Sequence, residues 1–414
     1  MPNTKTMYLG FFIAAFVSHL AQAMVYDNRF IPLFQRPQLI IDDSHSEFAV
    51  EWFMTTANNS LNNNQQNIGL PEIFGLFDQV QLANAIAATG KPNPLPSEFQ
   101  VLTRLPWEVS GKRQAQGISF VWNQMLYEWV SIGFSWLFMR VDSRDEFRLD
   151  VANIESRIAL KPGDAILLES TLHKMFREIN IQDGNTAQLG FGDIDTYIRV
   201  GNRWDYTMRF RSIDAGIRFG GLFPTGVTRE LNRPESIPFG GNGHWGVYSA
   251  VDAMFELKED WKTGLLFRVN KRFAKTREHR MPVEKEPSIF GAVVGPARVN
   301  PGFTFILSPY FLLENLRKGL ILGLNFTMTW HQRDRWCDQR CDKSVPVMLE
   351  QVRERSSWRS EYFTINVLYD FGKVKANRDF NPIITFRWDV PSTLFIAGGI
   401  NRAQRITLGL DFVF

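Results

Sequence analysis

Residues 404–414, Gln-Arg-Ile-Thr-Leu-Gly-Leu-Asp-Phe-Val-Phe, end the chain with a regular alternation of side chains. Every second residue from Ile406 to Phe414 is apolar, whereas Thr407, Gly409 and Asp411 between them are small or polar. Because successive side chains of a β-strand point to opposite faces, this spacing predicts a strand with one strongly apolar face. The same pattern recurs upstream and decides the fold class.

Alternation is clearest in six further stretches. They are residues 384–390, 363–371, 322–330, 303–313, 263–269 and 245–257. Residues 208–219 also alternate but change phase near Ser212, and the earlier candidates are 193–200, 130–138, 116–122 and 48–56. We therefore expect about twelve strands, or fourteen if residues 100–109 supply another pair.

The composition fits a membrane-spanning sheet better than a helical membrane protein. Hydrophobic residues make up 44% of the chain and charged residues 21%, and the mean hydropathy is -0.18. The one long apolar run is at the N-terminus, whereas helical spans would each need about 20 apolar residues. Aromatic residues are frequent, with 35 Phe and 12 Trp. A sheet in a bilayer must close on itself, because lipid cannot satisfy unpaired backbone groups.

Connections between the expected strands alternate in length. Short turns are expected at Gly201-Asn202-Arg203, Glu259-Asp260, Leu316-Arg317-Lys318 and residues 372–379, and longer polar connections at 223–243, 277–299, 332–356 and 391–403. Short periplasmic turns and long extracellular loops are typical of outer-membrane barrels. We predict an all-β fold, a transmembrane antiparallel β-barrel. The alternative is a soluble sandwich with the aromatic face as its core.

Three segments lie outside the regular strands. Residues 1–23 are expected to be a cleaved signal peptide, because Lys5 precedes the apolar run 8–17 and Ala21-Gln22-Ala23 gives a small-x-small cleavage site. The mature barrel would then span residues 24–414. Residues 58–111 and 142–189 are partly helical inserts, and the sequence leaves open whether they cap the barrel or plug its lumen.

Charged residues on the expected inner faces are the candidate site. They either bias solute passage or pair across the lumen to stiffen the wall, and five arginines among them would give the lumen one basic side. The lumen-lining candidates are Arg199, Arg209, Arg211, Asp214, Arg218, Asp252, Glu256, Arg268, Arg272, Arg387 and Asp389.

Other chemistry finds little support in the sequence. Cys337 and Cys341 lie in an expected extracellular loop, where an oxidising compartment favours a disulfide between them. The histidines show no ligand spacing, so we expect no metal or other cofactor. His244 and Ser249, five residues apart, would point to opposite faces of a strand, so we expect no enzyme. The net charge of +3 gives no reason to expect a nucleic-acid partner.

Two stretches resemble known proteins. The ending Leu410-Asp411-Phe412-Val413-Phe414 resembles the terminal signature of Gram-negative outer-membrane proteins, which implies recognition by the barrel assembly machinery. Residues 190–276, with Leu-Phe-Pro-Thr-Gly at 222–226 and Gly-Gly-Asn-Gly at 240–243, resemble the FadL-like and aromatic-pathway transporters of hydrophobic compounds. That resemblance implies an N-terminal hatch in the lumen, formed here by residues 24–44 or by the 58–111 insert.

The sequence therefore predicts an outer-membrane channel or transporter for passive uptake of small solutes, with hydrophobic compounds as one option. Its partners would be outer-membrane lipid, the barrel assembly machinery and a small-molecule solute. The competing hypothesis is a structural or surface-interaction barrel whose lumen is filled by charge pairs.

Overall fold

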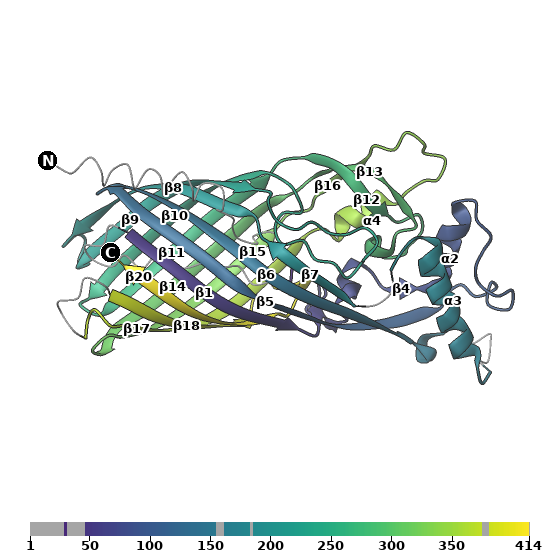
Figure 1. Cartoon of the computed structure of the whole chain (residues 1–414), viewed down its shortest axis with the longest axis horizontal. Helices are drawn as coiled ribbons and strands as arrows, with labels where there is room; N and C mark the ends of the chain where they lie inside the picture. Colours follow the sequence, from purple (N-terminus) through teal and green to yellow (C-terminus); the bar gives the residue numbers. More distant parts are fainter. Residues whose placement is uncertain (1–28, 31–45, 155–160, 183–184, 375–380, 414) are drawn as a thin grey trace.

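The chain folds into a closed antiparallel β-barrel with a large structure beyond one end (Figure 1). The computed structural model describes residues 29–30, 46–154, 161–182, 185–374 and 381–413. Within these ranges the barrel has twelve strands, and the short strands β4 (Phe77–Asp78) and β7 (Thr186–Phe191) extend its sheet. The strand number expected from the alternation is confirmed.

Each barrel strand pairs with its neighbours in the ring. The strands are β1 (Ser46–Ala57), β5 (Pro106–Tyr127), β6 (Val130–Leu149), β8 (Ile194–Asp205), β9 (Ser212–Phe223), β10 (Gly246–Lys258), β11 (Trp261–Arg272), β14 (Phe303–Arg317), β15 (Leu320–His331), β17 (Trp358–Asp370), β18 (Asn381–Pro391) and β20 (Gln404–Val413). The last strand, β20, closes the ring against β1 by placing Phe412 opposite Phe48. Closure leaves no barrel strand with a free edge in lipid.

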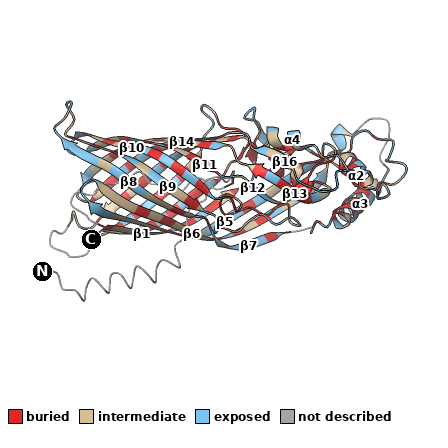
Figure 2. Ribbon diagram, turned by 90° about the horizontal axis from the view of Figure 1, so that it is seen from above, coloured by how far each residue is buried: buried red, intermediate tan, exposed pale blue. Residues whose placement is uncertain are grey.

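The exposure of apolar and polar side chains on the two strand faces is the reverse of that in a soluble protein. Large apolar side chains such as Phe219 and Leu324 are exposed on the outer wall. Polar side chains such as Thr407 and Arg387 are buried on the inner wall. Figure 2 shows this alternation of exposed and buried residues along the strands. The outer face therefore suits lipid, and the inner face forms a polar lumen.

The short turns all lie at one end of the barrel and the long loops at the other. The turn between β5 and β6 is Glu128-Trp129, and the turn between β10 and β11 is Glu259-Asp260. Two expected turns are displaced: Gly201-Asn202-Arg203 lies inside β8, with the turn at residues 206–211, and Leu316 and Arg317 end β14, with the turn at 318–319. Trp204 and Asp205 continue the strand and pair with β9, whose register shows no bulge at Ser212.

The long-loop end carries the smaller elements. Strands β5 and β6 continue beyond the barrel, so the ends of both inserts, residues 106–111 and 142–149, are strand. The small elements are the helices α2 (Gln79–Ala88), α3 (Asp164–Glu178) and α4 (Leu349–Glu354), the 3-10 helices η1 (Pro71–Phe74), η2 (Val151–Asn153) and η3 (Ser288–Phe290), and the strands β2 (Ser60–Leu61), β3 (Asn67–Ile68), β12 (Lys275–Met281), β13 (Val293–Asn300), β16 (Arg335–Asp338) and β19 (Ile400–Asn401). In the described part of the chain, no helix has the length and apolarity needed to cross a membrane.

The two inserts pack on each other through their own apolar core. Phe77, Phe147, Phe176 and Phe290 meet with ring centroids 5.2–5.9 Å apart, several of them edge to face. Helix α2 begins where the Asp78 carboxylate accepts the amide hydrogen of Val80 at 2.9 Å. These inserts therefore form a dome over the long-loop end, where α2 and α3 lie in Figure 1.

Candidate functional site

The lumen-facing arginines of β8 to β11 are held by carboxylates. Arg199 on β8 donates hydrogen bonds to Asp214 and, at 2.9 Å, to Asp252. Arg218 on β9 bonds the other carboxylate oxygen of Asp252 at 2.8 Å. All four side chains are largely buried. They form one compact network across three strands in which two arginines neutralise two aspartates.

A second group sits further along β11. Arg268 contacts Asp195 at 3.0 Å, and its guanidinium lies 3.4 Å from the centroid of the Tyr248 ring. The Tyr248 hydroxyl donates a 2.6 Å hydrogen bond to the same Asp195. Arg272, next inward-facing charge along the strand, pairs with Asp193 at 2.8 Å.

The opposite wall repeats this arrangement. Arg387 on β18 pairs with Glu51 on β1 at 3.2 Å, and Asp389 pairs with Arg405 on β20 at 2.7 Å. All four are buried. Both ion pairs of this wall join strands that are adjacent or one strand apart in the ring.

Two of the candidates do not line the central lumen. Arg209 is exposed in the turn between β8 and β9, with a left-handed φ of 71°. Arg211 ends the same turn with a side chain 41% exposed, and it contacts Glu256 at 3.4 Å and Glu259 at 3.4 Å. The alternation over residues 208–219 predicts one strand, whereas β9 begins only at Ser212 and leaves both arginines in the turn.

An apolar cluster occupies the lumen toward the long-loop end. Ile237 and Phe239, from the connection between β9 and β10, pack there with Phe30 against inward-facing residues of the wall such as Tyr248 and Ile306. Phe239 is fully buried. The connection therefore folds into the barrel, and we call this group the lumen cluster.

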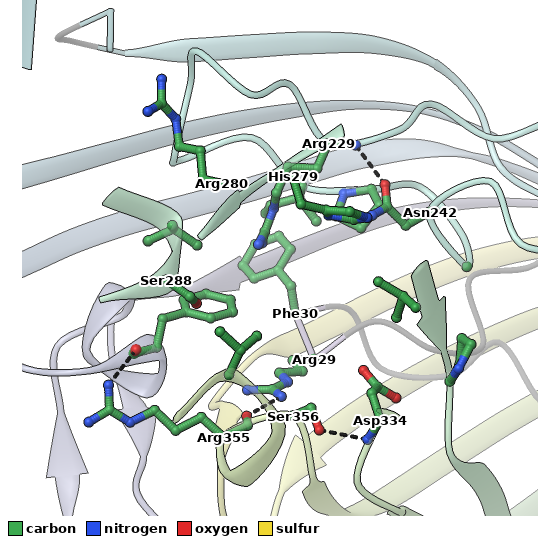
Figure 3. A pocket seen from close by; sticks show the side chains of 18 of the residues that line it. Arg29, Phe30, Arg229, Asn242, His279, Arg280, Ser288, Asp334, Arg355 and Ser356 are labelled. Atoms are coloured by element: carbon green, nitrogen blue, oxygen red, sulfur yellow. Dashed lines mark hydrogen bonds between the residues drawn. The ribbon is translucent and has the colours of Figure 1, made fainter. Parts of the chain in front are cut away.

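Directly above the lumen cluster lies a cavity of about 250 Å³, shown in Figure 3. Phe30 and Ile237 belong to both the cluster and the cavity wall. We call this space the vestibule. Its basic lining residues are Arg29, Arg113, Arg229, Arg272, Arg277, Arg280, Arg355, His244, His279 and His331. The acidic ones are Glu230, Glu278 and Asp334.

Three of these arginines gather around Phe74 of η1. The guanidinium carbon of Arg29 lies 5.5 Å from the centroid of the Phe74 ring, and that of Arg229 lies 4.9 Å from it. Arg355 donates a 2.7 Å hydrogen bond to the Phe74 carbonyl and accepts one from Arg29 on its own carbonyl. Segments that are 326 residues apart in the chain thus meet at one aromatic ring.

The partners of these vestibule arginines are carbonyl oxygens rather than carboxylates. Arg229 donates to the carbonyl of Ser236 at 3.1 Å, and Arg277 donates to that of Asn242. Arg280 donates hydrogen bonds to four backbone carbonyl oxygens and so links the segments that carry them. Among the described residues, Arg29, Arg229, Arg277 and Arg355 form no ion pair within 4.0 Å, in contrast to the arginines of the lumen.

Burial without a counter-charge lowers the pKa values of these arginines. Burial lowers the pKa of Arg29 to about 10, and the field of Asp334 offsets only part of that effect. Burial, together with repulsion from Arg113 and Arg29, lowers the pKa of Arg229 to about 10. The pKa values of Arg277 and Arg355 are also lowered by burial. All four remain protonated at neutral pH.

Several buried nitrogen atoms of the vestibule wall have no hydrogen-bond partner among the residues that the structure describes. These are Nη1 of Arg29, Nε of Arg113, Nε2 of His279 and Nε1 of Trp336. Buried polar groups are nearly always satisfied in native proteins. The acids do little to compensate: Glu230 pairs outward with Arg233 at 3.4 Å, and Asp334 binds the Gly302 amide and His331.

The sequence pointed to none of the central vestibule residues except Arg272. Arg29, Arg229 and Arg355 lie in irregular segments where no periodic pattern marks a face. The one available signal was the excess of Arg and His in the long connections, with Arg277, His279 and Arg280 close together.

The remaining expectations concern cysteine and metal. Cys337 in β16 and Cys341 in the following loop are exposed free thiols in the structure, and the disulfide between them stays a prediction. Within the described ranges, no group of three His, Cys, Asp or Glu side chains could hold a metal ion. The signal peptide, most of the segment 24–44, and Phe414 lie outside the described residues.

Comparison with known proteins relates the chain to outer-membrane barrels. No family model and no curated protein matches its sequence. A solved outer membrane channel from Pseudomonas putida F1 is similar over 93% of this chain and 100% of that one, with 11% identity and a TM-score of 0.48. A FadL homologue from Pseudomonas aeruginosa is similar over 90% of both chains, with 8% identity and a TM-score of 0.31. Likenesses at this level carry no argument about substrate.

Proposed function

We propose that this chain is an outer-membrane channel that admits small solutes by passive passage. The observation that carries the proposal is the vestibule, a cavity lined by charged side chains directly above a polar lumen. The outer wall is apolar around the whole ring, as a bilayer requires. The long-loop end would face outward, and the two chain ends of the barrel would face the periplasm.

The lumen cluster is the expected constriction of this path. A solute leaving the vestibule meets Phe30, Ile237 and Phe239 before it reaches the charged pairs below. Because Ile237 and Phe239 belong to a connection and not to a barrel strand, they can move without opening the sheet. The proposed passage therefore depends on displacement of this connection.

Export and assembly complete the proposal. Residues 1–23 would direct the chain across the inner membrane and be removed after Ala23. The barrel assembly machinery would recognise the terminal strand that ends in Phe414. The proposal includes no catalytic step, and we assign the vestibule a binding role only.

Single-channel recording of the purified mature chain in planar bilayers tests the function. We expect discrete conductance steps, and we expect the variant Phe239→Ala to increase open time or conductance because it removes part of the constriction. The matched control is Phe303→Ala, which removes a ring from the outer face. A bilayer that stays silent with both the wild type and Phe239→Ala would contradict the proposal.

The second candidate function is a structural or surface-interaction barrel without transport. The paired charges of the lumen favour it, because they stiffen the wall and leave few free ions to guide a solute. Silent bilayers, together with full stability of the Phe239→Ala barrel, would select this candidate.

A further inference from the structure

We propose that the vestibule binds a small organic anion with two or more negative charges, held by Arg29, Arg229 and Arg355. This inference rests on the proposed function, because it names the class of solute that the channel would admit. It also decides between the two solute types considered from the sequence, in favour of charged solutes over hydrophobic compounds.

The first support is the balance of charge. Four arginines at the vestibule, Arg29, Arg229, Arg277 and Arg355, have only carbonyl or aromatic partners among the described residues. Of the acids in the described wall of the vestibule, Asp334 is the one that faces inward near them, since Glu278 is exposed and Glu230 pairs outward. A site with several uncompensated cations favours a ligand that carries more than one negative charge.

The second support is geometry. The guanidinium carbons of Arg29 and Arg229 lie 5.5 Å and 4.9 Å from the centroid of the same Phe74 ring, which brings the two groups close together. Arg355 is fixed to the backbone of that same residue. All three side chains line the vestibule, so a solute bound there lies near all three, and the Phe74 ring packs against two of them. Arginine is well suited to this task, because its fork matches a carboxylate or phosphate.

The third support is the set of unsatisfied nitrogen atoms. Within the described part of the chain, Nη1 of Arg29 is buried without an acceptor, and the same holds for Nε1 of Trp336 on another part of the wall. An anion brings acceptor oxygens to such donors, whereas a hydrocarbon would leave them unpaired. At about 250 Å³ the cavity falls just below the ~300–1,000 Å³ of typical drug-sized pockets, which limits the ligand to a small solute.

Calorimetric titration of the full mature chain in neutral detergent micelles tests the inference. The probes are citrate, with three carboxylates, acetate, with one, and uncharged glycerol. We expect citrate to bind more tightly than acetate by at least about tenfold, glycerol not to bind, and the affinity for citrate to fall with added salt. Equal binding of citrate and acetate, or no binding of citrate, would overturn the inference.

Substitutions locate the site. Arg229→Gln and Arg355→Gln should each weaken citrate binding by about tenfold or more, the loss expected for one charged hydrogen bond. The matched control is Arg233→Gln, in the same connection as Arg229 but outside the vestibule wall. An equal loss in the control would show binding to the general positive surface and overturn the site. Heat-modifiable gel mobility verifies that each variant is folded.

Two further experiments distinguish a soluble ligand from a lipid, and a failure of the binding site from a failure of the channel. A lipid phosphate offers similar oxygens, so lysophosphatidic acid is titrated alongside inorganic phosphate. Binding of the lipid through Arg229, without binding of citrate or inorganic phosphate, would overturn the proposal that the ligand is a small soluble anion. A chain that conducts in bilayers but does not bind citrate refutes this inference alone. A chain that binds citrate at the vestibule but never conducts refutes the proposed channel and leaves the binding site.

Discussion

The lumen and the vestibule are both rich in arginine, but Arg199 and Arg218 of the lumen have carboxylate partners, whereas Arg229 and Arg355 of the vestibule have none among the described residues. In the lumen, Arg199 and Arg218 share Asp214 and Asp252, so each buried charge has a counter-charge. In the vestibule, Arg229 and Arg355 rest on carbonyl oxygens and an aromatic ring. The same residue type therefore stabilises the barrel in one place and stays available to a ligand in the other.

The energetic consequence follows from burial. Replacement of a whole buried ion pair by apolar residues often costs little, but removal of one partner leaves the other charge buried and uncompensated. An arginine without a carboxylate partner leaves no orphaned charge behind when it is removed. Stability should therefore depend on the lumen arginines, and ligand affinity on the vestibule arginines.

The strongest test of this comparison is Arg199→Gln. It leaves Asp214 without its arginine and should lower the free energy of unfolding by ~3–5 kcal/mol. Arg229→Gln should change it by less than about 1 kcal/mol. Urea unfolding followed by tryptophan fluorescence measures both. If Arg199→Gln does not fold, the double variant Arg199→Gln/Asp214→Asn should recover part of the loss. Equal effects of the two single variants would break the comparison.

The next test concerns the connection between β18 and β20, in which Asn401 lines the vestibule. Glu361 at the start of β17 is buried, and its carboxylate accepts amide hydrogens from residues 394–397. Glu361→Gln replaces one acceptor oxygen by a donor, and we expect a loss of about 2–3 kcal/mol. Urea unfolding and protease cleavage within residues 392–403 measure it. Glu354→Gln on the exposed end of α4 is the control, and unchanged cleavage would contradict the prediction.

The sequence predicted the barrel because its signal is local. Alternation of apolar and polar residues with a period of two is imposed along each strand separately, as in residues 404–413, and it needs no knowledge of the neighbours. The same pattern predicts inner-wall positions for Arg199, Asp252 and Arg387, and all three side chains are buried. It did not give their partners, because pairing depends on the register between strands.

The vestibule could not be predicted in this way. Arg29 precedes β1, and Arg355 lies in the connection between β15 and β17. They meet only through the tertiary fold, and neither lies in a periodic segment. Arg209 was misplaced for a related reason. Tyr206, Met208 and Arg209 all have a positive φ, which ends the strand, yet none is a residue that marks a turn in the sequence.

A smaller effect is expected from the two cysteines. Both thiols are exposed near the vestibule element β16. A disulfide between Cys337 and Cys341 would close a very short loop, so its removal by Cys337→Ser/Cys341→Ser should cost no more than ~2 kcal/mol. Thiol alkylation of protein isolated from the oxidising compartment measures the bond. Full alkylation of both thiols without prior reduction would show that it does not form.

The smallest effect is a pH dependence within the vestibule. His279 packs edge to face on Trp336, with ring centroids 4.8 Å apart. Burial, and then repulsion from Arg277, His244 and Arg229, lowers its pKa to about 4, below the ~6.5 of an unfolded chain. The unfolded state therefore takes up the proton first as the pH falls. The stabilising contribution of neutral His279 is complete above pH ~6.5 and is lost progressively toward pH ~4.

Because the imidazole is only partly shielded from water, we expect this contribution to be about 1–2 kcal/mol. The measurement is the fall in urea midpoint between pH 7 and pH 4.5, which should be larger for the wild type than for His279→Gln. An equal fall in both would contradict the prediction. Citrate sharpens the test: a bound polyanion offsets the repulsion from Arg277 and Arg229 and so raises the pKa of His279. The difference between wild type and variant should then shrink in citrate, whereas acetate should leave it unchanged.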